Sequence, residues 1–485
     1  MSKYFFVLYF SVLGISSAYS QNYKQDFETF RQQALKGYRN FRDSINAEFA
    51  EFMRQAWPEY ESKPAVPVPD SPEPPAPIIK EPDTPPSNDP VPFDKVTPAP
   101  KPVEPPQPVV PIPEPTPQPI VPDKPTFAFN FYGEKCQMPL EDKHRFTLGG
   151  VTENNVADGW KVLSSDKYLP VIAKCLDYRS KLRLCDWGYV RFVEKMTAAF
   201  FPSSQQNEAR LMQMFILTQS GYKVRIAQAN NKLVLLLPSK ETIYRYSYLS
   251  IGGSRYYVTD SSLKEASLRV FDREFPKEQF FSLRISEPPA LPISRSVSRQ
   301  LQSKHDREVG AKVSINKNLI DFYNDYPISS HWDIYANASL SELVKEQLYP
   351  VLRSSIAGKG EADAANILLH FVQTALEYAT DEEQFGEERP LFGDETLFYP
   401  YSDCEDRAIL FSILVRELLG LDVVFLYYPG HLATAVCFDT PVTGDYLQVD
   451  GKRYVVCDPT YINADIGQSM TQFKQTPATV FKISR

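Results

Sequence analysis

The sequence predicts an α+β protein with two related lobes, which follow an N-terminal amphipathic helix and a proline-rich spacer. Three observations lead to this prediction. Helical periodicity gives way to short β-branched runs after residue 404, a similar pattern occurs about 200 residues earlier, and 25 of the 42 prolines fall between Pro64 and Pro125. The length of 485 residues also suits two or three domains rather than one.

Residues 1–20 have the layout of a cleaved secretory signal. Lys3 is followed by an apolar run and then by Ala18-Tyr19-Ser20, just before Gln21. Such a segment is too short and wrongly flanked for a stable membrane anchor. No later window approaches the roughly 18 apolar residues of a membrane span. We therefore expect export to the periplasm or the extracellular space, with no integral membrane span after the signal is cleaved.

The next segment, residues 21–60, predicts one long amphipathic helix over residues 22–56. Its apolar side chains recur in steps of four, three and four, at Tyr23, Phe27, Phe30, Ala34, Tyr38, Phe41, Ile45, Phe49, Phe52 and Ala56. A stripe of this kind must be buried. The sequence leaves three sites of burial open: the folded part of the same chain, a second copy, or a partner protein.

Residues 61–126 form the proline-rich tract. Proline fixes φ and lacks a backbone donor, so we expect a disordered or polyproline II spacer here rather than a helix or a sheet core. A ligand for a proline-reading module is the alternative interpretation. Beyond this tract, the polar and proline-interrupted segment 286–308 marks a boundary between two lobes, 127–290 and 315–485, with residues 291–314 as the expected connector.

The segment from residue 399 to residue 467 carries the most information about chemistry. A helical pattern ends at Gly420, which suits a C-terminal cap. Three short runs, Val423–Leu426, Leu432–Val436 and Tyr454–Cys457, then read as antiparallel strands. The prediction is a helix followed by a sheet.

Three reactive side chains occupy the ends of these predicted elements. Cys404 falls in the first turn of the helix, where free N–H groups and the helix dipole favour a thiolate and can hold an oxyanion. His431 opens the second strand, and Asp458 closes the third. A thiol, a base and a carboxylate that orients the base are the groups that nucleophilic acyl transfer requires. Because Glu405 and Asp406 adjoin the thiol, we expect the thiolate to depend on pairing with protonated His431.

This order of residues resembles the transglutaminase-like cysteine enzymes of the papain-like superfamily, and is similar to the secreted transglutaminase-like proteins of Bacteroides-type bacteria. The segment FVQTALEYATDEEQFG (371–386) resembles the helix and tyrosine that lead to the nucleophile in that family. The resemblance covers roughly residues 315–475. It implies a papain-like fold for this lobe, with Cys404, His431 and Asp458 as the catalytic residues of a cysteine protease, amidase or acyltransferase. The implied substrate is a protein or a peptide.

Residues 127–290 contain a second, altered version of the same pattern. Glu208 aligns with Glu405, Gly221 with Gly420, and the run GGSRYYVTD (252–260) with DGKRYVVCD (450–458), at a nearly constant offset of about 198 residues. On this alignment Asn207, Lys232 and Asp260 occupy the positions of Cys404, His431 and Asp458. We therefore expect a degenerate copy of the catalytic lobe that cannot perform thiol chemistry.

The composition excludes some functions and leaves others open. A net charge of −8 and a pI near 5.4 argue against nucleic-acid binding. The spacing of the six cysteines fits no zinc site, no acidic loop supports calcium, and no cofactor is implied. Two disulfides are conceivable from spacing, Cys175–Cys185 and Cys437–Cys457. The alternative to an enzyme is a non-catalytic binding or scaffolding protein that docks through helix 22–56.

Overall fold

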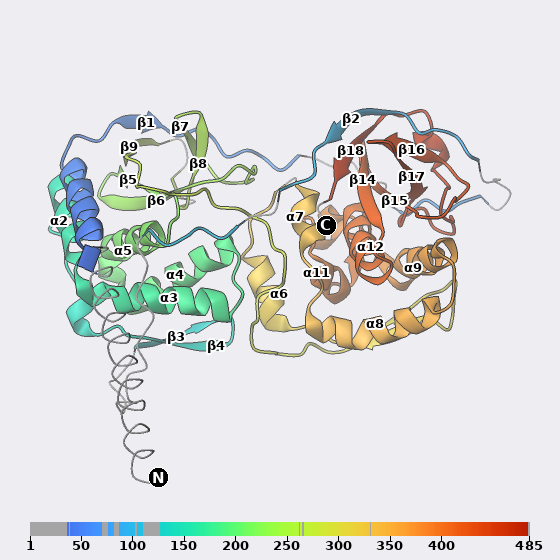
Figure 1. The fold of residues 1–485 in the computed structure, drawn as a ribbon, viewed down its shortest axis with the longest axis horizontal. Helices are drawn as coiled ribbons and strands as arrows, with labels where there is room; N and C mark the ends of the chain where they lie inside the picture. Colours follow the sequence, from blue (N-terminus) through green and yellow to red (C-terminus); the bar gives the residue numbers. More distant parts are fainter. Residues whose placement is uncertain are drawn as a thin grey trace, which may run out of the picture.

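The computed structural model describes residues 36–37, 39–69, 76–81, 87–101, 104–109, 127–260, 262–263, 266–329 and 331–483. These residues form an α+β protein with two lobes side by side, and each lobe combines several helices with one curled sheet (Figure 1). The expected signal segment, 1–20, and the first part of the expected helix, 22–35, lie outside the described residues. Within the described ranges, no helix has the length and apolar character needed to cross a bilayer.

Residues 39–53 form a helix, as the sequence predicts, and this helix packs on the N-terminal lobe. The side chain of Phe49 is 3% exposed, and its ring centroid lies 4.9 Å from the centroids of Trp160 and Phe271. Phe41, on the same stripe, is 48% exposed. The chain itself therefore buries the C-terminal part of the aromatic stripe.

The N-terminal lobe contains the hairpin of β3 (Phe127–Phe131) and β4 (Glu134–Met138) and the helices α2 (Glu153–Leu163), α3 (Leu169–Lys181), α4 (Asp186–Phe200) and α5 (Gln206–Gln219). Its six-stranded sheet has the order β1-β9-β5-β6-β8-β7. The bounds are Glu59–Glu61 for β1, Arg225–Ala229 for β5, Lys232–Pro238 for β6, Tyr248–Ile251 for β7, Ser254–Val258 for β8 and Ser267–Phe271 for β9. Helix α5 packs directly on β5 and β6.

The expected connector, 291–314, contains the hairpin of β10 (Arg299–Gln302) and β11 (Gly310–Val313). This hairpin packs on α8 and α9 and so belongs to the C-terminal lobe. The helices of that lobe are α6 (Lys317–Asn324), α7 (Trp332–Asn337), α8 (Glu342–Ile356), α9 (Glu361–Ala375), α10 (Asp381–Phe385), α11 (Gly393–Phe398) and α12 (Cys404–Leu418).

Helix α12 lies at the centre of the C-terminal lobe, in contact with α7, α9, α11 and the sheet (Figure 1). Every residue from Cys404 to Val415 is buried, because the helix is packed on all sides. The six-stranded sheet has the order β16-β17-β15-β14-β18-β2, with bounds Phe93–Thr97 for β2, Asp422–Tyr428 for β14, His431–Cys437 for β15, Tyr446–Val449 for β16, Lys452–Cys457 for β17 and Ala478–Lys482 for β18. The predicted helix and three strands are confirmed as α12, β14, β15 and β17.

The two sheets have the same strand order. Read in one direction, they run β7-β8-β6-β5-β9-β1 and β16-β17-β15-β14-β18-β2. Helix α5 directly precedes β5 in the chain, and α12 directly precedes β14. In each sheet one edge strand, β1 or β2, comes from residues before 100. One difference is that β1 runs antiparallel to β9 whereas β2 runs parallel to β18.

The described parts of the proline-rich tract run along both lobes, which differs from the expected free spacer (Figure 1). The backbone amides of Lys63, Lys80 and Val91 donate to carbonyl oxygens of the two lobes at 2.8, 2.9 and 2.8 Å. Strand β2, with the sequence FDKVT, contains no proline and occupies a sheet edge. Edge positions tolerate neighbouring prolines, and the residues between prolines retain donors, so short proline-free runs of the tract can join a sheet.

None of the six cysteines, all of which are described, takes part in a disulfide. Cys437 faces Asp422 and Cys457 faces Thr434 in the strand register, so the two thiols are not cross-strand neighbours. Cys175 Sγ lies 3.7 Å from the sulfur of Met196, and Cys185 Sγ lies 3.9 Å from the hydroxyl of Tyr326. Each cysteine of the two pairs considered from spacing therefore packs against other groups.

Candidate active site

Cys404 is the first residue of α12. The preceding Asp403 has an extended backbone, and its side chain accepts a hydrogen bond from the backbone amide of Asp406 at 3.4 Å. An aspartate at this position is a favoured N-cap, so the local sequence fixes where the helix starts. The thiol consequently lies at the positive end of the helix dipole.

His431 is positioned by a tight hairpin. Tyr428 of β14 faces His431 of β15 across a two-residue turn, Pro429-Gly430. Gly430 has a φ of 75°, which a residue with a side chain adopts only with strain. The imidazole is 2% exposed and stacks on the ring of Phe473, with centroids 5.1 Å apart and planes 2° from parallel. The ring is thus held inside the lobe.

Asp458 follows the last residue of β17 and orients the imidazole. Its Oδ2 lies 2.8 Å from His431 Nε2, and its Oδ1 accepts from the backbone amide of Thr460 at 3.0 Å. Gln373 of α9 holds the same turn, because its side-chain amide donates to the carbonyls of Asp458, Tyr461 and Ala464 at 3.1, 2.8 and 3.0 Å. Asp458 is therefore fixed on both sides.

The sulfur of Cys404 lies at the start of β15. The backbone amide of Leu432, the residue after His431, donates to Cys404 Sγ at 3.3 Å. The thiol itself donates to Glu405 Oε2 at 3.2 Å. The structure therefore brings the start of α12, the start of β15 and the end of β17 together, which are the three positions that the sequence analysis selected.

Cys404 and His431 both line a cavity of about 420 Å³. One wall is aromatic: the Trp332 ring centroid lies 5.1 Å from the centroids of Tyr427 and Phe481. Tyr244 of the N-terminal lobe also lines the cavity. So do residues of the proline-rich tract, at Val68, Pro69, Lys95 and Thr97. The cavity is therefore built from both lobes and the tract.

Acidic side chains surround the start of α12. Burial and the neighbouring Glu405 raise the pKa of Asp406 well above its ordinary value. Arg407 is also buried, and its guanidinium donates to the Ser402 hydroxyl and to the carbonyls of Gln373 and Leu376. Burial lowers the pKa of Arg407. Arg407 thus joins α9 to α12 through neutral acceptors.

The N-terminal lobe repeats parts of this geometry with different side chains. Asn207 lies in the first turn of α5, and its Oδ1 accepts from the amide of Leu233 at 2.8 Å, as Cys404 Sγ does from Leu432. Lys232 follows a two-residue turn at the start of β6. Asp260 Oδ1 accepts from the amide of Ser262 at 3.0 Å, as Asp458 does from Thr460. Asn207 and Asp260 therefore accept hydrogen bonds comparable to those of Cys404 and Asp458, and Lys232 follows a two-residue turn as His431 does.

Sequence reasoning did not identify several residues that build the site. Gln373 lies in the segment 371–386 that precedes the nucleophile. A glutamine on the apolar face of α9 was the sequence feature that could have indicated its role. Phe473, Trp332 and Tyr244 gave no signal, because their contacts with the site depend on elements distant in the chain. Comparison of the chain with protein-family models, with curated proteins and with solved structures finds no match in any of the three.

Proposed function

We propose that this protein is a transglutaminase-like thiol enzyme that cleaves or transfers at an amide or peptide bond through an acyl-enzyme on Cys404. One observation carries the proposal. The imidazole of His431 is bonded to Asp458 at 2.8 Å, while the amide of the next residue, Leu432, is bonded to the sulfur of Cys404 at 3.3 Å. A nucleophile, a base and an orienting carboxylate arranged in this way are the parts of a cysteine acyl transferase.

In the proposed reaction, Cys404 Sγ attacks the carbonyl carbon of the amide and its proton passes to His431. Because Nε2 is bonded to Asp458, Nδ1 is the ring nitrogen that exchanges this proton. The C–N bond then breaks, the amine leaves with the proton from the imidazole, and a thioester remains. Water or a second amine attacks the thioester, so the acyl group is hydrolysed or transferred and the thiol is regenerated.

The cavity supports a protein or peptide as the substrate. Its aromatic wall of Trp332, Tyr427 and Phe481 offers an apolar surface for an acyl-side residue, while Lys95 and Glu388 add charges of both signs. A cavity of mostly apolar lining with a few polar groups is typical of a ligand site.

We interpret the N-terminal lobe as a degenerate copy of the catalytic lobe. The shared strand order and the matched contacts of Asn207 and Asp260 support this interpretation. An amide and an ammonium group replace the thiol and the imidazole, so the aligned positions of this lobe hold neither a thiol nucleophile nor an imidazole base. Its contribution of Tyr244 to the cavity suits a role in substrate binding.

Export remains a proposal based on residues 1–20. The alternative function, a non-catalytic scaffold that docks through the N-terminal helix, has less support. Phe49 and Met53 of that helix are already buried against the N-terminal lobe, so they are not available to a partner.

Trapping of the acyl-enzyme tests the proposal. Hydroxylamine attacks thioesters, so incubating the full chain with a peptide library and hydroxylamine should produce peptidyl hydroxamates. The variant Cys404→Ala should produce none, whereas Cys437→Ala, a change at the far end of β15, should behave as wild type. Equal hydroxamate formation by Cys404→Ala would contradict the proposal.

A further inference from the structure

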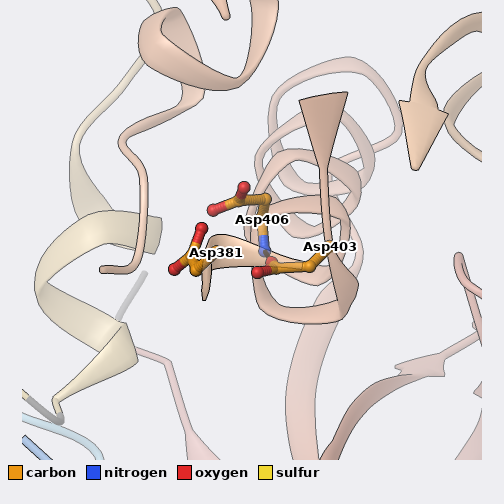
Figure 2. A group of neighbouring side chains, drawn as sticks. All are labelled: Asp381, Asp403 and Asp406. Carbon is orange, nitrogen blue, oxygen red and sulfur yellow. Dashed lines mark hydrogen bonds between the residues drawn. The ribbon is translucent and has the colours of Figure 1, made fainter. Parts of the chain in front are cut away.

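A cluster of buried carboxylates lies beside the start of α12. Asp381 comes from the first turn of α10, Asp403 caps α12, and Asp406 belongs to the first turn of α12 (Figure 2). Their exposed fractions are 2%, 0% and 0%. One oxygen from each residue lies within 4.8 Å of the oxygens of the other two. Asp381, Glu388 and Glu405 form a second, overlapping group that meets the same limit.

The hydrogen bonds that Asp381 and Asp406 accept come from backbone amides and satisfy only part of the two carboxyl groups. Asp381 Oδ2 accepts from the backbone amide of Arg389 at 2.6 Å, and Asp406 Oδ1 accepts from that of Leu391 at 2.9 Å. The second oxygen of Asp406, Oδ2, is buried and has no hydrogen-bond partner. A buried carboxylate oxygen without a partner has lost its hydrogen bonds to water and gained none from the protein, which costs free energy. Figure 2 shows the Asp406 carboxylate directed toward Asp381.

Basic side chains near the cluster direct their hydrogen bonds to other groups, and Arg407 interacts with Asp403 and Asp406 through its charge. Among the described residues, no ion pair joins an arginine or lysine to Asp381 or Asp406. Arg389 pairs with Glu395, and Arg407 donates to a hydroxyl and two carbonyls. Such a cluster needs either protons or a cation.

The helix dipole accounts for only part of the cluster. Acidic residues in a first turn stabilise a helix, and Asp403 is an ordinary N-cap. Asp381, however, comes from a different helix, and a capping role leaves the Oδ2 atom of Asp406 without a partner. Carboxylates that converge from two helices and a buried carboxylate oxygen without a partner are features of a site for a positively charged ligand.

The geometry points to a binding site for one hard divalent cation between Asp381, Asp403 and Asp406, with Ca²⁺ preferred over Mg²⁺. Calcium–oxygen distances are about 2.3–2.6 Å, so opposite ligands of one Ca²⁺ ion are roughly 5 Å apart, and oxygens within 4.8 Å of one another fit around it. Mg²⁺ retains several waters, which a buried site accommodates poorly. The ion would join α10 to the start of α12, and this inference does not depend on the chemistry of Cys404.

Calorimetric titration of the full chain tests the site. After removal of metal with a chelator, CaCl₂ should bind at one site and raise the melting temperature by roughly 5 °C at saturation, because a ligand that binds only the folded state stabilises it. MgCl₂ should bind more weakly. Equal or tighter binding of Mg²⁺ would overturn the stated preference, and absence of binding by both ions would overturn the site.

Asp381→Asn separates cation binding from a structural effect. Asparagine retains an oxygen that can accept from the amide of Arg389, so this variant should fold, and without calcium it should melt no lower than wild type because a buried like charge is removed. Its calcium response should be lost. The control Asp394→Asn changes a buried carboxylate of α11 that is bonded to Ser341, and it should keep the full response. An undiminished calcium response in Asp381→Asn would overturn the inference.

Discussion

Among single residues, Asp458 contacts the imidazole of His431, and in the proposed reaction it acts only through that ring. The carboxylate bonds the imidazole through Oδ2 and its own turn through Oδ1. Because the two hydrogen bonds use different oxygens, replacing one oxygen can alter the bond to His431 and preserve the bond from Thr460.

Asp458→Asn is therefore expected to fold normally and to react slowly. Asparagine can still accept from Thr460 through its oxygen, but its amide then faces Nε2 and favours the wrong tautomer of His431. We expect the rate of hydroxamate formation to fall by about 10²–10⁴-fold, with an unchanged free energy of unfolding. Asp422→Asn, at the distant end of β14, is the matched control and should keep the wild-type rate.

Gln373 supports the same turn through its amide and three carbonyls. Gln373→Leu leaves these buried carbonyls without that donor, so we expect a loss of about 3 kcal/mol in the free energy of unfolding, at about 1 kcal/mol for each hydrogen bond. Urea unfolding measures this loss. Gln205→Leu, which removes hydrogen bonds that are partly or fully accessible to solvent, should cost less than about 1 kcal/mol. Equal losses in the two variants would contradict the role assigned to Gln373.

At the scale of elements, the helix over residues 39–53 shows how the aromatic stripe is used. The ring centroid of Phe49 lies 4.9 Å from the ring centroids of Trp160, Phe271 and Phe275. Phe41, in contrast, is largely exposed. The two phenylalanines lie on one predicted stripe, but only one of them is part of the core.

Phe49→Ala should destabilise the N-terminal lobe by about 3–5 kcal/mol, because a buried aromatic ring is replaced by a cavity. Phe41→Ala should change stability by less than about 0.5 kcal/mol. Chemical denaturation followed by tryptophan fluorescence reports both values. A loss for Phe41→Ala as large as that for Phe49→Ala would mean that the exposed half of the stripe is also buried in solution.

The elements that carry reactive groups could be predicted from the sequence, because capping, turn and strand signals are local. Asp403 before Cys404 and Pro429-Gly430 before His431 are signals of this kind. The acidic cluster could not be predicted, since Asp381 reaches Asp406 only after α10 packs beside α12. From the sequence we expected no calcium site because no single loop is acidic enough. The clustered carboxylates come from two separate helices.

At the scale of the whole molecule, the proline-rich tract is a structural part of both lobes. It supplies β2 to one sheet and lines the cavity that contains Cys404 and His431. The sequence predicted a spacer because its composition is dominated by proline. Pairing of a short proline-free run with a distant sheet edge has no local signature, which explains the difference.

Hydrogen exchange of the tract tests this arrangement. The amides of Lys80 and Val91 donate to Ile462 and Tyr446, so they should exchange at least about 10²-fold more slowly in the full chain than in a free peptide of residues 61–109. Exchange at the rate of the peptide would show that the tract is detached in solution.

In the proposed mechanism His431 activates Cys404, so the alkylation rate of this thiol should depend on the imidazole. Iodoacetamide at pH 6.5, followed by peptide mapping, should modify Cys404 faster than the other five cysteines. His431→Asn should slow this modification by about 10²-fold, whereas His370→Asn, a change at another buried histidine, should leave it unchanged. A Cys404 that reacts in His431→Asn at the wild-type rate would contradict the account.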